Sequence, residues 1–161
     1  MLIQKITQAW AKTGHDGQTL YDHTFQCANA GLHLARFASG YSTAKLGTLI
    51  VALCIHDIGK LDPAFQLMLK TRLRGQTYDG KLVKHEGQSL AHDHVPLVEN
   101  SLAELATELK ANFNYRLNID QFLRDDGWEW AWAAAVNHHG LFYLSYEQDE
   151  AGNIQRRARR Q

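Results

Sequence analysis

The sequence has few prolines and few cysteines, and its formal net charge is zero. Two prolines in 161 residues leave long helices few obstacles. The two cysteines, Cys27 and Cys54, lie in apolar, helical-looking stretches, so we interpret them as buried core thiols in a reducing compartment. The 17 basic and 17 acidic residues balance, which excludes a general attraction to polyanions. Any contact with nucleic acid must therefore come from local patches.

A long hydrophobic run is also missing. The apolar run at residues 49–55 is far too short to span a bilayer, and we find no secretory signal. These absences predict a soluble, cytoplasmic protein with no membrane partner. The length fits one domain, and 45% hydrophobic residues are enough to build a core.

Helical spacing of apolar residues runs through most of the chain and predicts an all-α fold. Helices are expected at 2–11, 20–37 and 44–58, from Asp62 and Pro63 onward, from His94 through Leu109, and at 128–137. The expected N-caps are Thr19 and either Ser42 or Thr43. The helix at 44–58 is apolar nearly all round, which indicates a central, buried position. The polar, Gly-rich stretch at 72–92 is expected to be a long loop, and no strand pair is visible.

Histidine, in contrast, is abundant, with nine in the chain. His56 and Asp57 close the apolar helix, where buried polar groups must be paired and buried charges paired or bound to metal. Imidazole and carboxylate are ligands of intermediate hardness that suit a transition-metal ion. Lys60 follows one turn after His56 and can neutralise a phosphate oxygen or position a water. Taken alone, the His-Asp pair could equally be a helix C-terminus with a favourable dipole contact to His56.

Further histidines strengthen the metal interpretation through their order along the chain. His138 and His139 follow a tryptophan-rich helix, where the alternative is a polar turn. His23 lies near the start of the second helix, where a lone histidine is usually structural. Because each of these positions is near a helix end, several helices can converge around one shared site.

These motifs resemble the HD nuclease domain of the CRISPR-associated helicase-nuclease of type I systems. The extension of the His-Asp pair through Pro63, Phe65 and Gln66 is more specific than the pair itself, because generic HD phosphohydrolases rarely continue this way. The resemblance covers residues 10 to about 140, and its motifs lie at 10–12, 19–23, 56–66 and 136–140.

The resemblance implies an HD-superfamily helical bundle around a metal site, at residues 1–146, followed by a polar, basic C-terminal tail at 147–161. It implies endo- and exonucleolytic cleavage of single-stranded DNA in CRISPR antiviral defence. The implied partners are single-stranded DNA, a helicase domain or subunit and an RNA-guided surveillance complex. The implied metal ligands are His23, His56, Asp57, His94, His138 and His139, and the implied catalytic residues are Asp57 and Lys60.

Two positions of the family pattern are ambiguous in this chain. The family has another histidine between the His-Asp pair and the histidine pair, and His85, His92 and His94 compete for this place. We favour His94, because Asp93 and His94 open the most helix-like segment, and His85 is the second choice. The family also has a last acidic metal ligand after the histidine pair. In this chain that ligand is either Asp149, or it is missing and the chain is a fragment.

The ligand set predicts one or two divalent transition-metal ions. A nitrogen-rich shell favours manganese, nickel, cobalt or iron over magnesium, and zinc would bind but hold a less suitable geometry. Asp57 would bridge two ions, with His23 and His56 on one and the middle histidine and the histidine pair on the other. Because an imidazole must be neutral to coordinate, activity is expected to fall in acid.

Basic residues follow the His-Asp helix and return at the end of the chain, where they can track a single-strand backbone or simply form a solvated surface. They are Lys70, Arg72, Arg74, Lys81, Lys84, Arg156, Arg157, Arg159 and Arg160. Trp128, Trp130 and Trp132 are spaced for core packing rather than for base stacking.

Two other functions remain open. The same metal site would serve a nucleotide phosphohydrolase, or an incomplete site could survive as a docking or DNA-binding module for a helicase.

Overall fold

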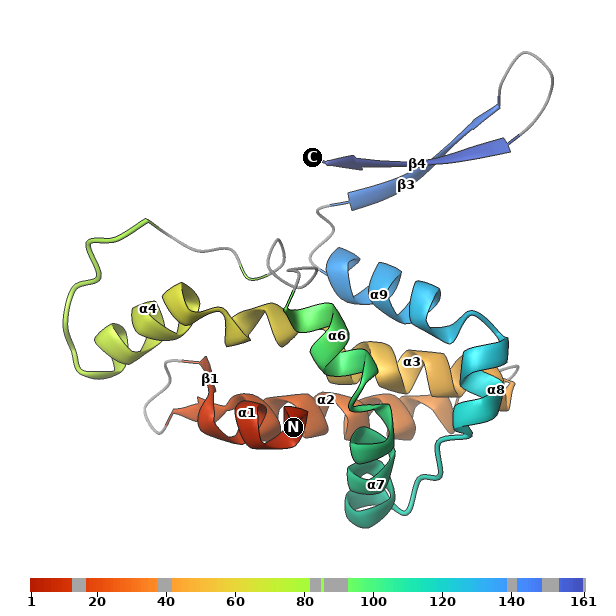
Figure 1. The fold of residues 1–161 in the computed structure, drawn as a ribbon, viewed down its shortest axis with the longest axis horizontal. Coiled ribbons are helices and arrows are strands. Elements are labelled where there is room, and N and C mark those ends of the chain that lie inside the picture. Colours follow the sequence, from red (N-terminus) through yellow and green to blue (C-terminus); the bar gives the residue numbers. More distant parts are fainter. Residues whose placement is uncertain are drawn as a thin grey trace.

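The computed structural model describes residues 1–12, 17–37, 42–81, 85 and 93–138, together with the backbone at 142–148 and 154–160. The described chain is mostly helical, which confirms the predicted all-α class (Figure 1). The helices are α1 (Leu2–Gln8), α2 (Leu20–Ala35), α3 (Thr43–Ile55), α4 (Pro63–Leu73), α6 (His94–Glu99), α7 (Leu102–Phe113), α8 (Ile119–Arg124) and α9 (Gly127–Asn137), with a 3-10 turn η1 (Ile58–Leu61). Within the described ranges, no helix is both long and apolar enough to cross a bilayer.

The predicted starts of three helices are confirmed by their N-caps. The Thr19 hydroxyl accepts a hydrogen bond from the backbone N–H of Asp22, and the Ser42 hydroxyl accepts one from Lys45. The Asp62 carboxylate accepts from two N–H groups in the first turn of α4, whose first residue is Pro63. These contacts satisfy donors that a helix N-terminus otherwise leaves unpaired.

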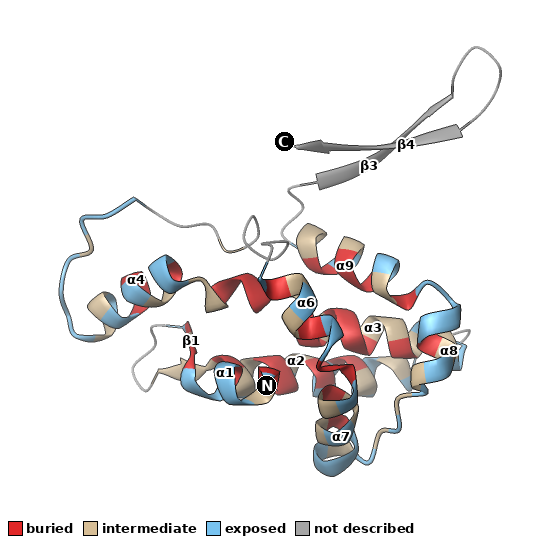
Figure 2. Cartoon of the chain, in the orientation of Figure 1, coloured by how far each residue is buried: buried red, intermediate tan, exposed pale blue. Residues whose placement is uncertain are grey.

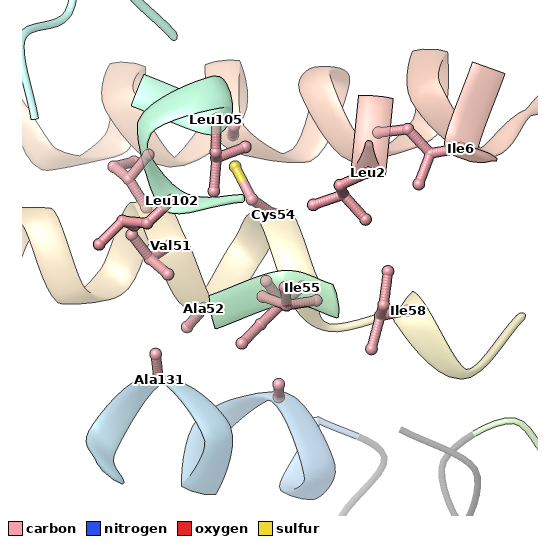
Figure 3. Close-up of a cluster of buried hydrophobic side chains, with 14 of the residues drawn as sticks. Leu2, Ile6, Val51, Ala52, Cys54, Ile55, Ile58, Leu102, Leu105 and Ala131 are labelled. Carbon is pink, nitrogen blue, oxygen red and sulfur yellow. The ribbon is translucent and has the colours of Figure 1, made fainter. Parts of the chain in front are cut away.

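Helix α3 is the central element, as its apolar surface predicts. It packs against α2 on one side and against α9 on the other, and buried positions lie along all three helices (Figure 2). Ile50, Val51 and Ile55 are completely buried, and small residues such as Ala131 let α9 approach closely (Figure 3). Helix α2 also approaches α3 closely at Gly31, where an added Cβ would lie 2.3 Å from Leu53 Cδ1.

The structure corrects three expected helix boundaries. The helix expected at 2–11 ends at Gln8. The helix expected at 44–58 ends at Ile55, and η1 then turns the chain so that Asp57 faces inward. The helix expected from His94 through Leu109 breaks at Ser101 into α6 and α7, which allows Leu105 and Leu109 to join the core. Helix α8 was not expected.

The described residues contain two antiparallel strand pairs, whereas the sequence predicted no strand pair. The short β1 (Trp10–Lys12) pairs with β2 (Gln18–Thr19) just before α2. Strand β3 (Phe142–Gln148) pairs with β4 (Ile154–Arg160), with Phe142 opposite Arg160 and Gln148 opposite Ile154. The boundary expected between residues 146 and 147 therefore falls inside a strand. Phe142, Tyr143 and Tyr146 are residue types that favour strands.

Candidate metal centre

Asp57 lies at the centre of the site, and its side chain is only 3% exposed. On one side, its Oδ2 atom is 2.9 Å from His23 Nε2 and 3.3 Å from His56 Nε2. The Lys60 ammonium also contacts this oxygen, with Nζ at 2.6 Å, and is itself buried. One oxygen of the carboxylate therefore faces two imidazoles and one amine.

The other oxygen of the carboxylate faces a second pair of imidazoles. Asp57 Oδ1 is 2.9 Å from His85 Nε2 and 3.6 Å from His138 Nε2. The His85 side chain is 13% exposed and that of His138 is 20% exposed, so this side is slightly more open to solvent. The two oxygens thus divide four histidines into two pairs.

Helix ends bring these residues together, as their positions in the sequence predict. His23 lies in the first turn of α2, His56 is the C-cap residue of α3, and His138 is the C-cap residue of α9. Asp57 lies at the junction between α3 and η1. Because α2 and α9 pack on either side of α3, the core itself determines the separation of these side chains.

The histidine tautomers indicate that a cation belongs between the rings and the carboxylate. His56 Nδ1 is 2.6 Å from the carbonyl oxygen of Leu53, and His138 Nδ1 is 2.5 Å from that of Ala135. A carbonyl only accepts, so both Nδ1 atoms carry the hydrogen, and Nε2 of each neutral ring is a bare lone pair. These lone pairs point at a buried carboxylate.

Either a second proton on each ring or a metal ion must separate these groups. Charging several neighbouring imidazoles would set like charges against one another. A shared metal ion avoids this, and two ligand atoms about 2.1 Å from one ion at 90–109° lie about 3.0–3.4 Å apart. The four N–O distances, from 2.9 to 3.6 Å, lie within about 0.2 Å of this range. The donor set therefore suits one or two divalent metal ions.

The electrostatics of Asp57 agree with this view. Burial by itself would raise the pKa of the carboxyl, but the side chains of His138, His23, His56 and His85 around it outweigh burial and hold the pKa well below its usual range. Asp57 is therefore a carboxylate throughout the range in which the protein would work, and it is available as a ligand.

This depressed pKa predicts a stability effect in the metal-free protein. The stabilisation from ionised Asp57 is fully present above the unfolded-state pKa, about 3.9, and is lost as the pH falls below it toward the folded-state pKa. Urea unfolding at several acidic pH values should show the wild-type free energy of unfolding falling more steeply than that of Asp57→Asn. The difference in slope should approach about 1.4 kcal/mol per pH unit. Parallel curves for the two proteins would contradict the depressed pKa.

The residues after the His-Asp pair support the site. Asp62 caps α4, with its Oδ1 atom 2.8 Å and 3.0 Å from the N–H nitrogens of Ala64 and Phe65. The Phe65 ring then meets the His85 ring edge-on, with centroids 5.3 Å apart. The start of α4 therefore helps to hold His85 against Asp57.

Gln66 ties three parts of the chain together. Its Nε2 group donates to the carbonyl oxygens of Lys60, at 2.7 Å, and Trp10, at 2.9 Å. Its Oε1 atom accepts from the Trp10 N–H at 2.9 Å. These bonds position the backbone that carries Lys60, which gives a physical reason for a motif that extends to Gln66.

The structure brings one of the three candidates for the middle histidine to the aspartate, and it is not the favoured one. His85 lies at Asp57, whereas His94 begins α6 and lies outside both groups of potential ligands found among the described residues. His94 is buried and instead lines a hollow beside Lys5 and Lys70. His92, His139 and Asp149 lie outside the described residues.

Cys27 lies beside the site, where sequence reasoning did not place it. Its Sγ atom is 3.9 Å from His23 Nε2, and His23, Cys27 and His56 form one group of potential ligand atoms. Burial and, to a smaller extent, the charge of Asp57 raise the pKa of the Cys27 thiol. The interpretation of both cysteines as core thiols is thus confirmed for Cys54, which is 6% exposed, and corrected for half-buried Cys27.

Two of the tryptophans pack as predicted. Trp132 is buried and stacks on half-buried Trp128, with ring centroids 6.3 Å apart. Trp130 is 44% exposed, so core packing does not account for it.

An all-helical core with histidines arranged around the aspartate of a His-Asp pair defines an HD-type domain. The chain matches the family described as "Cas3, HD domain" over residues 10–161 and belongs to that family. HD domains bind divalent metals, and the family is one of HD-type nucleases, so membership suggests a nucleic-acid substrate and a CRISPR context. No curated protein and no solved structure matches the chain significantly. The match includes β3 and β4, the segment expected to be mostly a tail.

Proposed function

We propose that this protein is a metal-dependent nuclease that cleaves single-stranded DNA at a centre of two divalent ions, which Asp57 and the histidines around it would hold. The observation that carries the proposal is the division of four histidines between the two oxygens of one buried carboxylate. His23 and His56 would hold one ion, and His85 and His138 would hold the other. His139, the neighbour of His138 in the sequence, remains a proposed ligand of the second ion.

Cleavage of a phosphodiester requires an activated nucleophile. The negative charge of the phosphate oxygens repels that nucleophile and must be neutralised. Divalent ions supply both when bound, because they lower the pKa of a water molecule and neutralise phosphoryl oxygens. Asp57 and the histidines would orient these ions. Lys60, whose ammonium already lies 2.6 Å from Asp57 Oδ2, would neutralise a further phosphate oxygen as negative charge develops. Manganese, nickel, cobalt or iron suits this mainly nitrogen donor set.

The surface that follows the site supports a polynucleotide substrate. Lys70, Arg72, Arg74 and Lys81 are all exposed on and after α4, the helix whose start contacts the centre through Phe65. Exposed cations in sequence can follow a phosphate backbone. A helicase and an RNA-guided complex in the cytoplasm are the proposed partners that would deliver single-stranded DNA.

A substrate panel tests this proposal. Metal-free protein is reloaded with manganese and given a labelled single-stranded oligonucleotide, the matching duplex and a mixture of deoxynucleoside triphosphates. We expect metal-dependent cleavage of the single strand, weaker or no cleavage of the duplex, and intact triphosphates. Hydrolysis of the triphosphates alone would indicate a nucleotide phosphohydrolase. A protein that leaves every substrate intact would be a docking module.

A further inference from the structure

Cys27 lies on the same face of α2 as His23. The two residues are four positions apart, which is about one turn of an α-helix, so their side chains are neighbours along the helix. Their ligand atoms, Sγ and Nε2, are 3.9 Å apart. His56, from α3, completes a group whose potential ligand atoms all lie within 4.8 Å of one another. The thiol therefore reaches the His23 and His56 side of Asp57.

The geometry fits coordination. A sulfur about 2.3 Å and a nitrogen about 2.0–2.1 Å from one tetrahedral ion are about 3.6 Å apart. Closing the observed 3.9 Å to that separation needs only a small side-chain adjustment. The group also contains two imidazoles, so the cysteine is not an isolated thiol.

The second cysteine shows what a purely structural thiol looks like in this fold. Cys54 lies in the core beside Leu2 and Leu105 (Figure 3), and it belongs to neither group of potential ligands found among the described residues. Cys27 instead is half-buried and lines a hollow of about 370 Å³ between α2 and α3, whose other walls include Leu34, Leu49 and Leu53. Small molecules can therefore reach Cys27 from solvent.

We propose that Cys27 is a direct thiolate ligand of the ion held by His23 and His56. This inference rests on the metal centre of the proposed function and deepens it. The centre would then be asymmetric, with nitrogen, sulfur and oxygen donors on one side of Asp57 but only nitrogen and oxygen donors among the described residues on the other. On binding, the S–H bond breaks, the proton passes to solvent, and the sulfur lone pair forms the bond to the ion. A thiolate makes this side more selective for zinc, cobalt or iron and less suited to manganese.

Cobalt spectroscopy tests the inference without any need for cleavage. The full chain is loaded with Co²⁺ as wild type, Cys27→Ser and Cys54→Ala, and bound cobalt is measured by elemental analysis. We expect an intense thiolate-to-cobalt charge-transfer band in the near ultraviolet for wild type and Cys54→Ala, and its loss in Cys27→Ser. Loss of an outer-shell partner alone weakens metal binding roughly 10- to 100-fold, so Cys27→Ser should weaken one cobalt equivalent at least that much.

Alkylation of the unmutated protein gives a second readout that does not depend on the folding of a variant. Iodoacetamide should modify Cys27 in the metal-free protein and much more slowly after cobalt loading, whereas Cys54 should stay unmodified in both. Bound cobalt without the charge-transfer band, or with no protection of Cys27, would overturn the inference and leave the histidine centre intact. Failure to bind cobalt at all would overturn both the inference and the proposed centre.

Discussion

Replacing Asp57 with asparagine should reduce metal-dependent DNA cleavage to the level seen after chelation. The amide keeps the shape of the side chain but removes the negative charge that two ions would share. Both oxygens face histidine pairs, so one substitution weakens both halves of the centre. Bound metal, measured by elemental analysis after gel filtration, should fall together with activity.

A matched control separates loss of the site from loss of the fold. Asp120, in the first turn of α8, is exposed, so Asp120→Asn makes the same chemical change away from the centre. Both variants should keep the helical circular dichroism signal, because the core around α3 consists of apolar residues that neither change touches. Cleavage that persists in folded Asp57→Asn would remove the proposed centre.

Replacing His85 with alanine should abolish cleavage, whereas His94→Ala should leave it within a few-fold of wild type. His85 Nε2 is 2.9 Å from Asp57 Oδ1, so its loss leaves His138 as the only described histidine on that oxygen. His94 lies outside the ligand groups of the described residues, and its removal should affect stability more than metal binding. Single-turnover cleavage rates and metal stoichiometry would distinguish the two outcomes.

His33→Ala provides the baseline for these histidine variants. His33 is exposed near the end of α2, the helix that carries His23, and it belongs to neither ligand group. The opposite pattern, with His94→Ala inactive and His85→Ala active, would return the role of middle histidine to His94.

Local signals in the sequence predicted the framework of this site well. The caps at Thr19 and Asp62 marked the starts of the helices on either side of the His-Asp pair. The apolar surface of the third helix predicted its central place, so that its polar end had to face other elements rather than solvent. Helix ends are set by short-range chemistry, which is why they can be read from neighbouring residues.

The identity of His85 could not be read in the same way. It depends on how the polar chain after α4 returns to the site and on the ring of Phe65, which is 20 positions earlier in the chain. Such long-range contacts leave no periodic signal. The break between α6 and α7 could not be predicted from the sequence either, because it follows from packing against the core rather than from a helix-breaking residue at Ser101.

For Cys27, in contrast, the sequence does contain a signal that places the residue beside His23. Its spacing of four from His23 places both side chains on one helix face, which the sequence alone would have shown. The apolar character of the surrounding stretch suggested a core thiol instead. A cysteine one turn from a candidate ligand therefore needs to be assessed as part of the same site.

The most direct test is the anomalous scattering from a crystal of the protein grown with cobalt. Two peaks are predicted, one on each side of the Asp57 carboxylate, with His23 and His56 around the first and His85 and His138 around the second. Peaks that lie away from Asp57, or a fully occupied metal that leaves its carboxylate uncoordinated, would contradict the two-sided centre.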